Sequence, residues 1–175
     1  EDGGLDFSAM ENGWVFAYIG LLGVIVQGGL IGRLTNKFDL DKLMIFGTVI
    51  CGVGIASIPY VPGHLSWLIF LSSTFIAVGN GLFSPTQSSL LTFESSKRGY
   101  ELGTVMGAQE GYGALARIFG PLLAAYLWSV TVEETGLWTY HTSFRVAGLI
   151  FIIATILQLR LHNNLKMSIS LAEQN

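Results

Sequence analysis

Residues 103–128 read GTVMGAQEGYGALARIFGPLLAAYLW, and this stretch has the length of a membrane-spanning helix. Crossing a bilayer takes about 20 mainly apolar residues. Gln109, Glu110 and Arg117 nevertheless lie inside the stretch. A charge near the centre of a membrane costs about 2.5–3.5 kcal/mol on insertion scales, so charged residues there face a water-filled path or a partner helix. We therefore expect a transmembrane helix with one polar face, and these three residues are candidates for the wall of a cavity.

Glu110 and Arg117 are seven residues apart, which is close to two helical turns, so both lie on one face. Helical side chains lean toward the N-terminus, and Arg117 therefore reaches toward Glu110. The sequence leaves three alternatives open for Glu110. Its carboxylate forms an ion pair with Arg117, lines the cavity independently of Arg117, or extends to the headgroups at the cytoplasmic surface. Arg117 lies nearer the middle of the span, so we expect it to face the cavity.

Glycines recur at every fourth position on a neighbouring stripe of the same predicted helix. This spacing allows another helix to approach the backbone closely. Pro85, inside another apolar stretch, removes a backbone donor and predicts a kink. The positions expected to serve helix packing or kinking are Gly28, Gly32, Gly103, Gly107, Gly111, Pro85, Gly120 and Pro121.

The composition indicates an integral membrane protein. Hydrophobic residues make up 51% of the chain, charged residues 12%, and the mean hydropathy is +0.56. A soluble domain carries about twice that charge. No basic stripe with interleaved aromatic residues suggests a nucleic-acid partner. The single cysteine, Cys51, excludes an intramolecular disulfide. His64 and His141 have no second ligand at metal spacing, and no catalytic constellation occurs inside the apolar stretches. We expect no metal, no cofactor and no enzymatic activity.

The apolar runs predict an all-α membrane protein with five transmembrane helices. Residues 1–12 are expected to form an extracytoplasmic loop segment, and residues 162–175 a mobile cytoplasmic tail. The bundle between them covers 13–161, with spans at about 13–32, 43–61, 65–93, 102–128 and 142–161. Three further polar residues inside the spans either line a path or form hydrogen bonds between helices: Gln27, Asn80 and Gln87. For Asn80, between two glycines, we favour the structural role.

The distribution of Lys and Arg predicts the orientation, because basic residues concentrate in cytoplasmic loops. One set of loops and the tail carries Arg33, Lys37, Lys42, Lys97, Arg98, Arg160 and Lys166. The opposite side carries only Arg145. We therefore expect the N-terminus outside and the C-terminus in the cytoplasm. Either a plasma or bacterial inner membrane, or an organelle membrane, would fit.

Three stretches resemble signatures of the major facilitator superfamily. Residues 28–42, GGLIGRLTNKFDLDK, resemble the cytoplasmic loop motif G-x-L-x-D-R-x-G-R-R, through Gly32, Leu34, Asn36, Lys37 and Lys42. Residues 79–91, GNGLFSPTQSSLL, are similar to helix 10 of that family. The stretch quoted first resembles helix 11 of the tetracycline-resistance-like drug:proton antiporters, through Gly103, Gly107, Arg117, Gly120 and Pro121.

The resemblance implies helices 8 to 12 of a twelve-helix transporter, that is, a C-terminal bundle lacking its first helix. Family proteins hold their substrate between two six-helix halves near the midplane. The expected partners are the lipid bilayer, a small-molecule substrate and the N-terminal half of the same transporter, which implies that the chain is a fragment. Efflux of drugs or metabolites coupled to protons is implied by the resemblance alone. The alternatives are an accessory subunit that packs through its glycine-rich faces, or a membrane enzyme completed by other segments.

Overall fold

The computed structural model of the chain describes residues 7–131 and 141–172, and it describes side chains for residues 7–130 and 141–164. Every regular element in this part of the chain is helical, which confirms the expected all-α fold. The elements in chain order are α1 (Ala9–Ile25), the π-helical turn η1 (Val26–Leu30), α2 (Ile31–Thr35), α3 (Leu40–Ser57), the short 3-10 turns η2 (Ile58–Tyr60) and η3 (Gly63–Leu65), α4 (Leu68–Arg98), α5 (Leu102–Thr131) and α6 (His141–Ala172).

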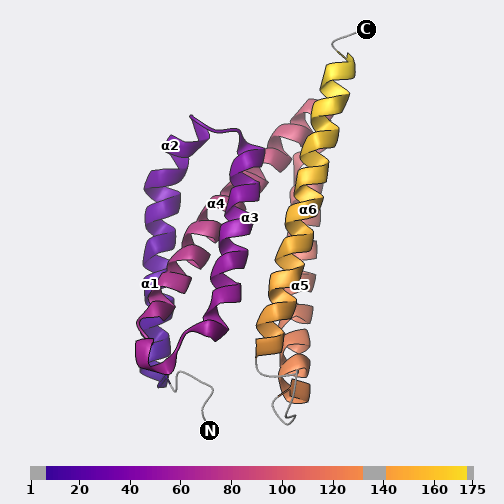
Figure 1. Ribbon diagram of the computed structural model, residues 1–175. Helices are drawn as coiled ribbons and strands as arrows, with labels where there is room; N and C mark the ends of the chain where they lie inside the picture. The colour runs from indigo at the N-terminus through magenta and orange to yellow at the C-terminus, as the bar shows by residue number, and fades with distance from the viewer. Residues whose placement is uncertain (1–6, 132–140, 173–175) are drawn as a thin grey trace.

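Within the described residues, five segments are long and apolar enough to cross a membrane, as the sequence predicts. They are Ala9–Thr35, Leu40–Tyr60, Leu68–Arg98, Leu102–Val130 and His141–Asn164. The helices alternate in direction: α1, α4 and α6 run one way, and α3 and α5 run the other way (Figure 1). The turn after α2, the end of α4 and the end of α6 therefore lie at the same end of the bundle. This is the end at which the basic residues gather.

The helices are longer than the apolar runs, so the predicted boundaries are wrong at several ends. The first helix begins at Ala9 rather than at residue 13, because Ser8 and Glu11 form a capping box that satisfies the free backbone donors. The last helix continues through Ala172, so residues 162–172 are not a separate tail. A helix ends where its backbone hydrogen bonds end, and in these two helices that point lies beyond the end of the apolar run. The predictions for residues 1–6 and 173–175 lie outside the described residues.

Helices α3 and α4 form the core, because glycines bring their backbones together. A Cβ atom placed on Gly79 would lie 2.7 Å from the carbonyl oxygen of Gly47. A Cβ atom on Gly54 would lie 2.9 Å from the carbonyl oxygen of Ser72. The Ser57 hydroxyl donates to Ser72 Oγ at 2.8 Å and closes this contact. The buried apolar side chains of the described residues are Val26, Leu43, Cys51, Ile69, Ala77 and Leu82.

The first helix packs on α4. The hydroxyl of Tyr18 lies 2.9 Å from Thr74 Oγ1, and its ring meets Phe70 edge to face at 5.3 Å. Nearer the other end, Val26 fills the space that the missing side chain of Gly81 leaves. One hydroxyl contact and one aromatic contact thus join α1 to α4, and an apolar contact from η1 adds to them.

The last helix packs on α3 at three levels. The Phe151 side chain lies against Gly52, where an added Cβ atom would be 2.8 Å from Phe151 Cβ. His141 stacks on Tyr60 with ring centroids 5.5 Å apart. At the opposite end, His162 Nδ1 contacts a carboxylate oxygen of Asp41. The two ends and the middle of α6 are therefore all fixed to α3.

The expected glycine stripes do not pack within the described part of the chain, and this corrects the sequence analysis. A Cβ atom would meet nothing within 4 Å at Gly28, Gly32, Gly103, Gly107, Gly111 and Gly120. The packing glycines are instead Gly47, Gly52, Gly54, Gly79 and Gly81. The reason is geometric: a four-residue spacing puts glycines on one face but does not say which neighbour that face meets.

Two prolines lie inside helices. Pro85 is within α4 and Pro121 within α5, and both helices continue through them. Proline has no N–H group, so the carbonyl four residues earlier loses its donor. The kink that we expect at Pro85 stays a prediction.

Candidate functional site

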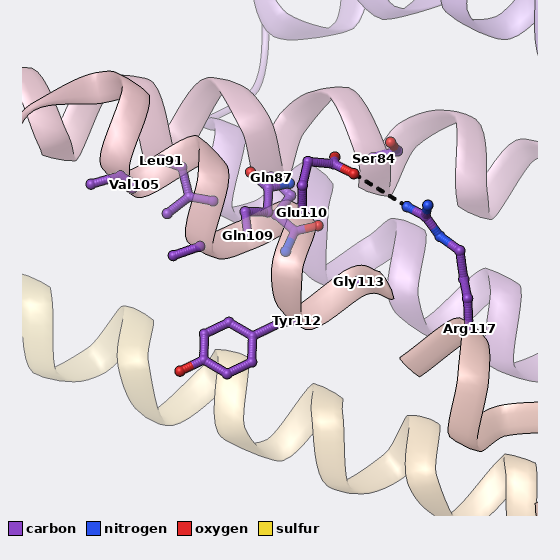
Figure 2. A pocket seen from close by; sticks show the side chains of 10 residues that line it. Ser84, Gln87, Leu91, Val105, Gln109, Glu110, Tyr112, Gly113 and Arg117 are labelled. Atoms are coloured by element: carbon purple, nitrogen blue, oxygen red, sulfur yellow. Dashed lines mark hydrogen bonds and ion pairs between the residues drawn. The ribbon is translucent and has the colours of Figure 1, made fainter. Parts of the chain in front are cut away.

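A recess with several polar lining residues lies between α4 and α5 and has a volume of about 620 Å³. Figure 2 shows its lining at close range. Helix α4 contributes Ser84, Gln87 and Leu91, and α5 contributes Val105, Ala108, Gln109, Glu110, Tyr112, Gly113 and Arg117. The sequence predicted four of these residues as cavity candidates: Gln87, Gln109, Glu110 and Arg117. We call this recess the α4–α5 pocket.

Glu110 and Arg117 form an ion pair across two turns of α5. Arg117 Nη2 donates to Glu110 Oε2 at 3.3 Å, and both side chains are 73% exposed. Figure 2 shows the guanidinium extending back along the helix to the carboxylate, as the lean of helical side chains predicts. The pair uses a single N–H of the five on the guanidinium, so both groups keep capacity for a ligand.

Gln109 lies on the side of α5 that faces α4. Its amide nitrogen lies 3.5 Å from Ser88 Oγ, at the outer limit of a hydrogen bond. Its Oε1 is buried and makes no hydrogen bond within the described residues. Gln87, half-buried on α4, lines the same pocket. The side-chain amides of Gln87 and Gln109 thus line the α4–α5 pocket together with the Glu110–Arg117 ion pair.

The other two cavity candidates lie elsewhere. Gln27 is exposed on the π-helical turn η1, and it is not part of the α4–α5 pocket. Asn80 lines a separate cavity between α3, α4 and α6. Sequence reasoning also missed Ser84 and Leu91, which share a face with Gln87 because they lie three residues before it and four after it. Both residues could have been predicted from the sequence, by counting three residues back and four residues forward from Gln87.

The residues of the predicted loop motif form a tight turn between α2 and α3. The backbone N–H of Lys37 donates to the carbonyl oxygen of Leu34 at 3.0 Å, and Asn36 caps α2. The carbonyl oxygen of Gly32 accepts from the Thr35 hydroxyl at 3.2 Å. Beyond the turn, Lys42 Nζ lies 2.6 Å from Asp39 Oδ2. The motif therefore shapes this connection and lies away from the α4–α5 pocket.

This arrangement of helices and loop can be compared with known proteins. Residues 3–166 match the profile of the Major Facilitator Superfamily. The chain belongs to this family. The resemblance seen in the loop motif and in the third and fourth spans is thereby confirmed at the level of the superfamily. The narrower assignment to the tetracycline-resistance-like group stays a prediction.

Several curated proteins are similar in sequence to parts of the chain. The chain is 27% identical over 148 residues to multidrug resistance protein 2 of Bacillus subtilis, which covers 84% of this chain and 34% of that protein. It is 32% identical over 90 residues to dipeptide and tripeptide permease A of Erwinia pyrifoliae, covering 50% of this chain and 18% of the permease. The corresponding permease of Escherichia coli is 30% identical over 70 residues, 40% of this chain and 13% of its own length.

The chain thus spans about a third of the length of its Bacillus relative. No solved structure matches the chain. Membership in a family of transporters, together with these permease relatives, supports the expectation that the chain is not an enzyme.

Proposed function

We propose that the chain is part of a secondary transporter that moves small organic molecules by alternating access, with the α4–α5 pocket on the substrate path. The observation that carries this proposal is the exposed Glu110–Arg117 pair inside a span that is otherwise uncharged. Lipid cannot supply acceptors for a guanidinium, so Arg117 needs a water-filled cavity, a partner or both. A pocket with two amides and an accessible ion pair supplies that environment.

The names of the relatives support a drug or a small metabolite as the substrate. One relative is a multidrug resistance protein, and others are permeases for dipeptides and tripeptides. Drug or metabolite efflux is our preferred direction, because the relative that covers most of the chain carries the multidrug name. Coupling to protons is part of the proposal and rests on the resemblance to drug:proton antiporters.

We assign the end of the bundle with the basic residues to the cytoplasm. Arg33, Lys37 and Lys97 lie at the same end, since α2 and α4 both end there (Figure 1). Cytoplasmic loops carry an excess of such residues. On this proposal the C-terminus is cytoplasmic, and the N-terminal half of the transporter covers the pocket.

The test removes the guanidinium from the protein that carries this chain. With ethidium as the probe, Arg117→Ala should slow efflux from cells about ten- to hundredfold, because a hydrogen bond to a charged group contributes about 1.5–3 kcal/mol. Arg117→Lys keeps the charge but loses the planar fork, so we expect partial rescue. Ile118→Ala, at an exposed apolar position next in the helix, is the matched control and should transport normally.

A double mutant separates a working pair from two independent charges. If Glu110 and Arg117 act together, Glu110→Gln combined with Arg117→Ala should be less impaired than the sum of the two single effects. Expression of each variant is measured in the same membranes, so that transport is compared per molecule. Efflux by Arg117→Ala at the wild-type rate would contradict the proposed role of the pocket, and a wild-type protein that does not move ethidium would contradict drug efflux.

A further inference from the structure

A second cavity is lined by residues of α3, α4 and α6. Its volume is about 210 Å³. Thr48 and Cys51 of α3, Asn80 and Phe83 of α4, and Phe151, Ala154 and Gln158 of α6 are among its lining residues. It shares no lining residue with the α4–α5 pocket. We call it the α6 cavity.

The sequence of α6 explains why this space is hollow. Phe151 enters the notch at Gly52 and brings α6 against α3. Ala154 follows three residues later on the same face, and its methyl group is too small to continue the contact. The helix cannot move inward to close the gap, because His141 stacks on Tyr60 at one end and His162 contacts Asp41 at the other. The cavity is therefore built into the packing of three helices.

Two side-chain amides at this cavity are unused. Within the described residues, neither Asn80 nor Gln158 makes a hydrogen bond. Asn80 is exposed at the edge of the cavity, whereas Gln158 Oε1 is buried and carries the cost of an unpaired polar atom. Thr48, by contrast, donates its hydroxyl to the carbonyl oxygen of Met44 at 2.9 Å. An amide held in apolar surroundings without a partner costs about 1–3 kcal/mol. A ligand that supplies a polar group here would remove that cost.

The size and the walls restrict the ligand further. Drug-sized ligands occupy pockets of roughly 300–1,000 Å³, which is more than this cavity offers, whereas an apolar cavity of about 150 Å³ holds benzene. Phe83 and Phe151 supply aromatic walls, and none of the lining residues is charged. A neutral molecule with a single ring and a polar group fits these properties.

We propose that the α6 cavity binds a small neutral phenol-like molecule, whose hydroxyl group forms hydrogen bonds with the amides of Asn80 and Gln158. The site shares no lining residue with the α4–α5 pocket, so its occupancy can be tested separately from the proposed substrate path. A bound ligand would contact α3, α4 and α6 at once and stabilise the packing of α6 on the core.

Photolabelling tests this site in the intact protein that carries the chain, reconstituted in lipid nanodiscs. A phenol with a diazirine group should attach to residues that line the α6 cavity, and mass spectrometry of the peptides locates the adducts. Unlabelled phenol should compete with the label at concentrations about tenfold lower than toluene, which replaces the hydroxyl by a methyl group. This comparison needs no mutation.

Two variants separate the site from general partitioning into lipid. Ala154→Phe fills the cavity and should abolish the adducts, whereas Ile153→Phe places a phenylalanine on the exposed face of α6 and should keep them. Gln158→Leu should remove the advantage of phenol over toluene. Equal competition by phenol and toluene in the unmodified protein, or full labelling of the cavity in Ala154→Phe, would overturn the proposal.

Discussion

The contact between α3 and α4 predicts opposite effects for two alanine substitutions that look alike in the sequence. At Gly79, an added Cβ atom would lie 2.7 Å from Gly47 O and from Cys51 Cβ. At Gly107, it would meet nothing within 4 Å. Both glycines lie inside long helices. Gly107 belongs to the glycine stripe of α5 that we expected to pack against another helix, and Gly79 does not.

The cost at Gly79 follows from the distances. Ordinary Cβ contacts begin at 3.4 Å, and the backbone nitrogen of Cys51 lies nearer than either of these atoms. The two backbones must therefore separate by at least about 0.7 Å, because interiors are close-packed and backbone atoms cannot rotate away. A gap of roughly 0.5–1 Å already forfeits a quarter to a half of the dispersion attraction along the contact. Overpacking of this kind costs about 1–3 kcal/mol. We expect Gly79→Ala to destabilise the protein by the upper part of that range.

At Gly107 the same substitution carries no packing cost. Alanine favours the helix over glycine by about 1 kcal/mol, so Gly107→Ala should be neutral or stabilising. The assay heats detergent-solubilised protein and measures the fraction that remains monodisperse by fluorescence-detected gel filtration. Gly79→Ala should lower the apparent melting temperature and Gly107→Ala should not. A Gly79→Ala variant as stable as the wild type would refute the argument that α3 and α4 meet at backbone distance.

Two further predictions follow from the same structure. Thr86, 1% exposed, donates its hydroxyl to Leu82 O at 2.6 Å, so Thr86→Val should destabilise the protein by about 1 kcal/mol in the same melting assay. The matched Thr92→Val, at an exposed position with a similar bond, should change little, and equal losses would contradict this reasoning. For the orientation, single cysteines at His64 and Lys97, introduced after Cys51→Ala, should react differently with an impermeant thiol reagent in intact cells. Labelling at position 97 but not at 64 would reverse the proposed topology.

Run length and hydropathy were enough to predict the class of fold and the five spans. In a bilayer every backbone donor must be satisfied inside the segment, so a long apolar run has few structures open to it. The ends of the helices were harder to predict. Capping at Ser8 and the continuation of α6 through Ala172 depend on backbone hydrogen bonds, which hydropathy does not measure.

The candidate site could likewise be predicted only in part from the sequence. The Glu110–Arg117 pair could be predicted because both residues lie on one helix, where spacing fixes the geometry. The positions of Asn80 and Gln109 depend on which helices meet, and a single sequence does not contain that information. The same limit explains the glycines. Gly47 and Gly79 pack against each other from different helices, whereas the regular stripe on α5 meets no part of the described chain.

The π-helical turn η1 has a consequence for the length of the first span. The backbone N–H of Ile31 donates to the carbonyl oxygen of Val26, five residues back, so this turn accommodates one residue more than an α-helical turn does. Each α-helical residue advances the face by about 100°. Removing one residue from Val26–Leu30 would let α1 run into α2 as a regular helix with Tyr18 and Leu34 still on their present faces. The same deletion in the middle of α1 would turn one end of the span away from α4. In a sequence alignment, we therefore expect this helix to tolerate a one-residue gap at η1.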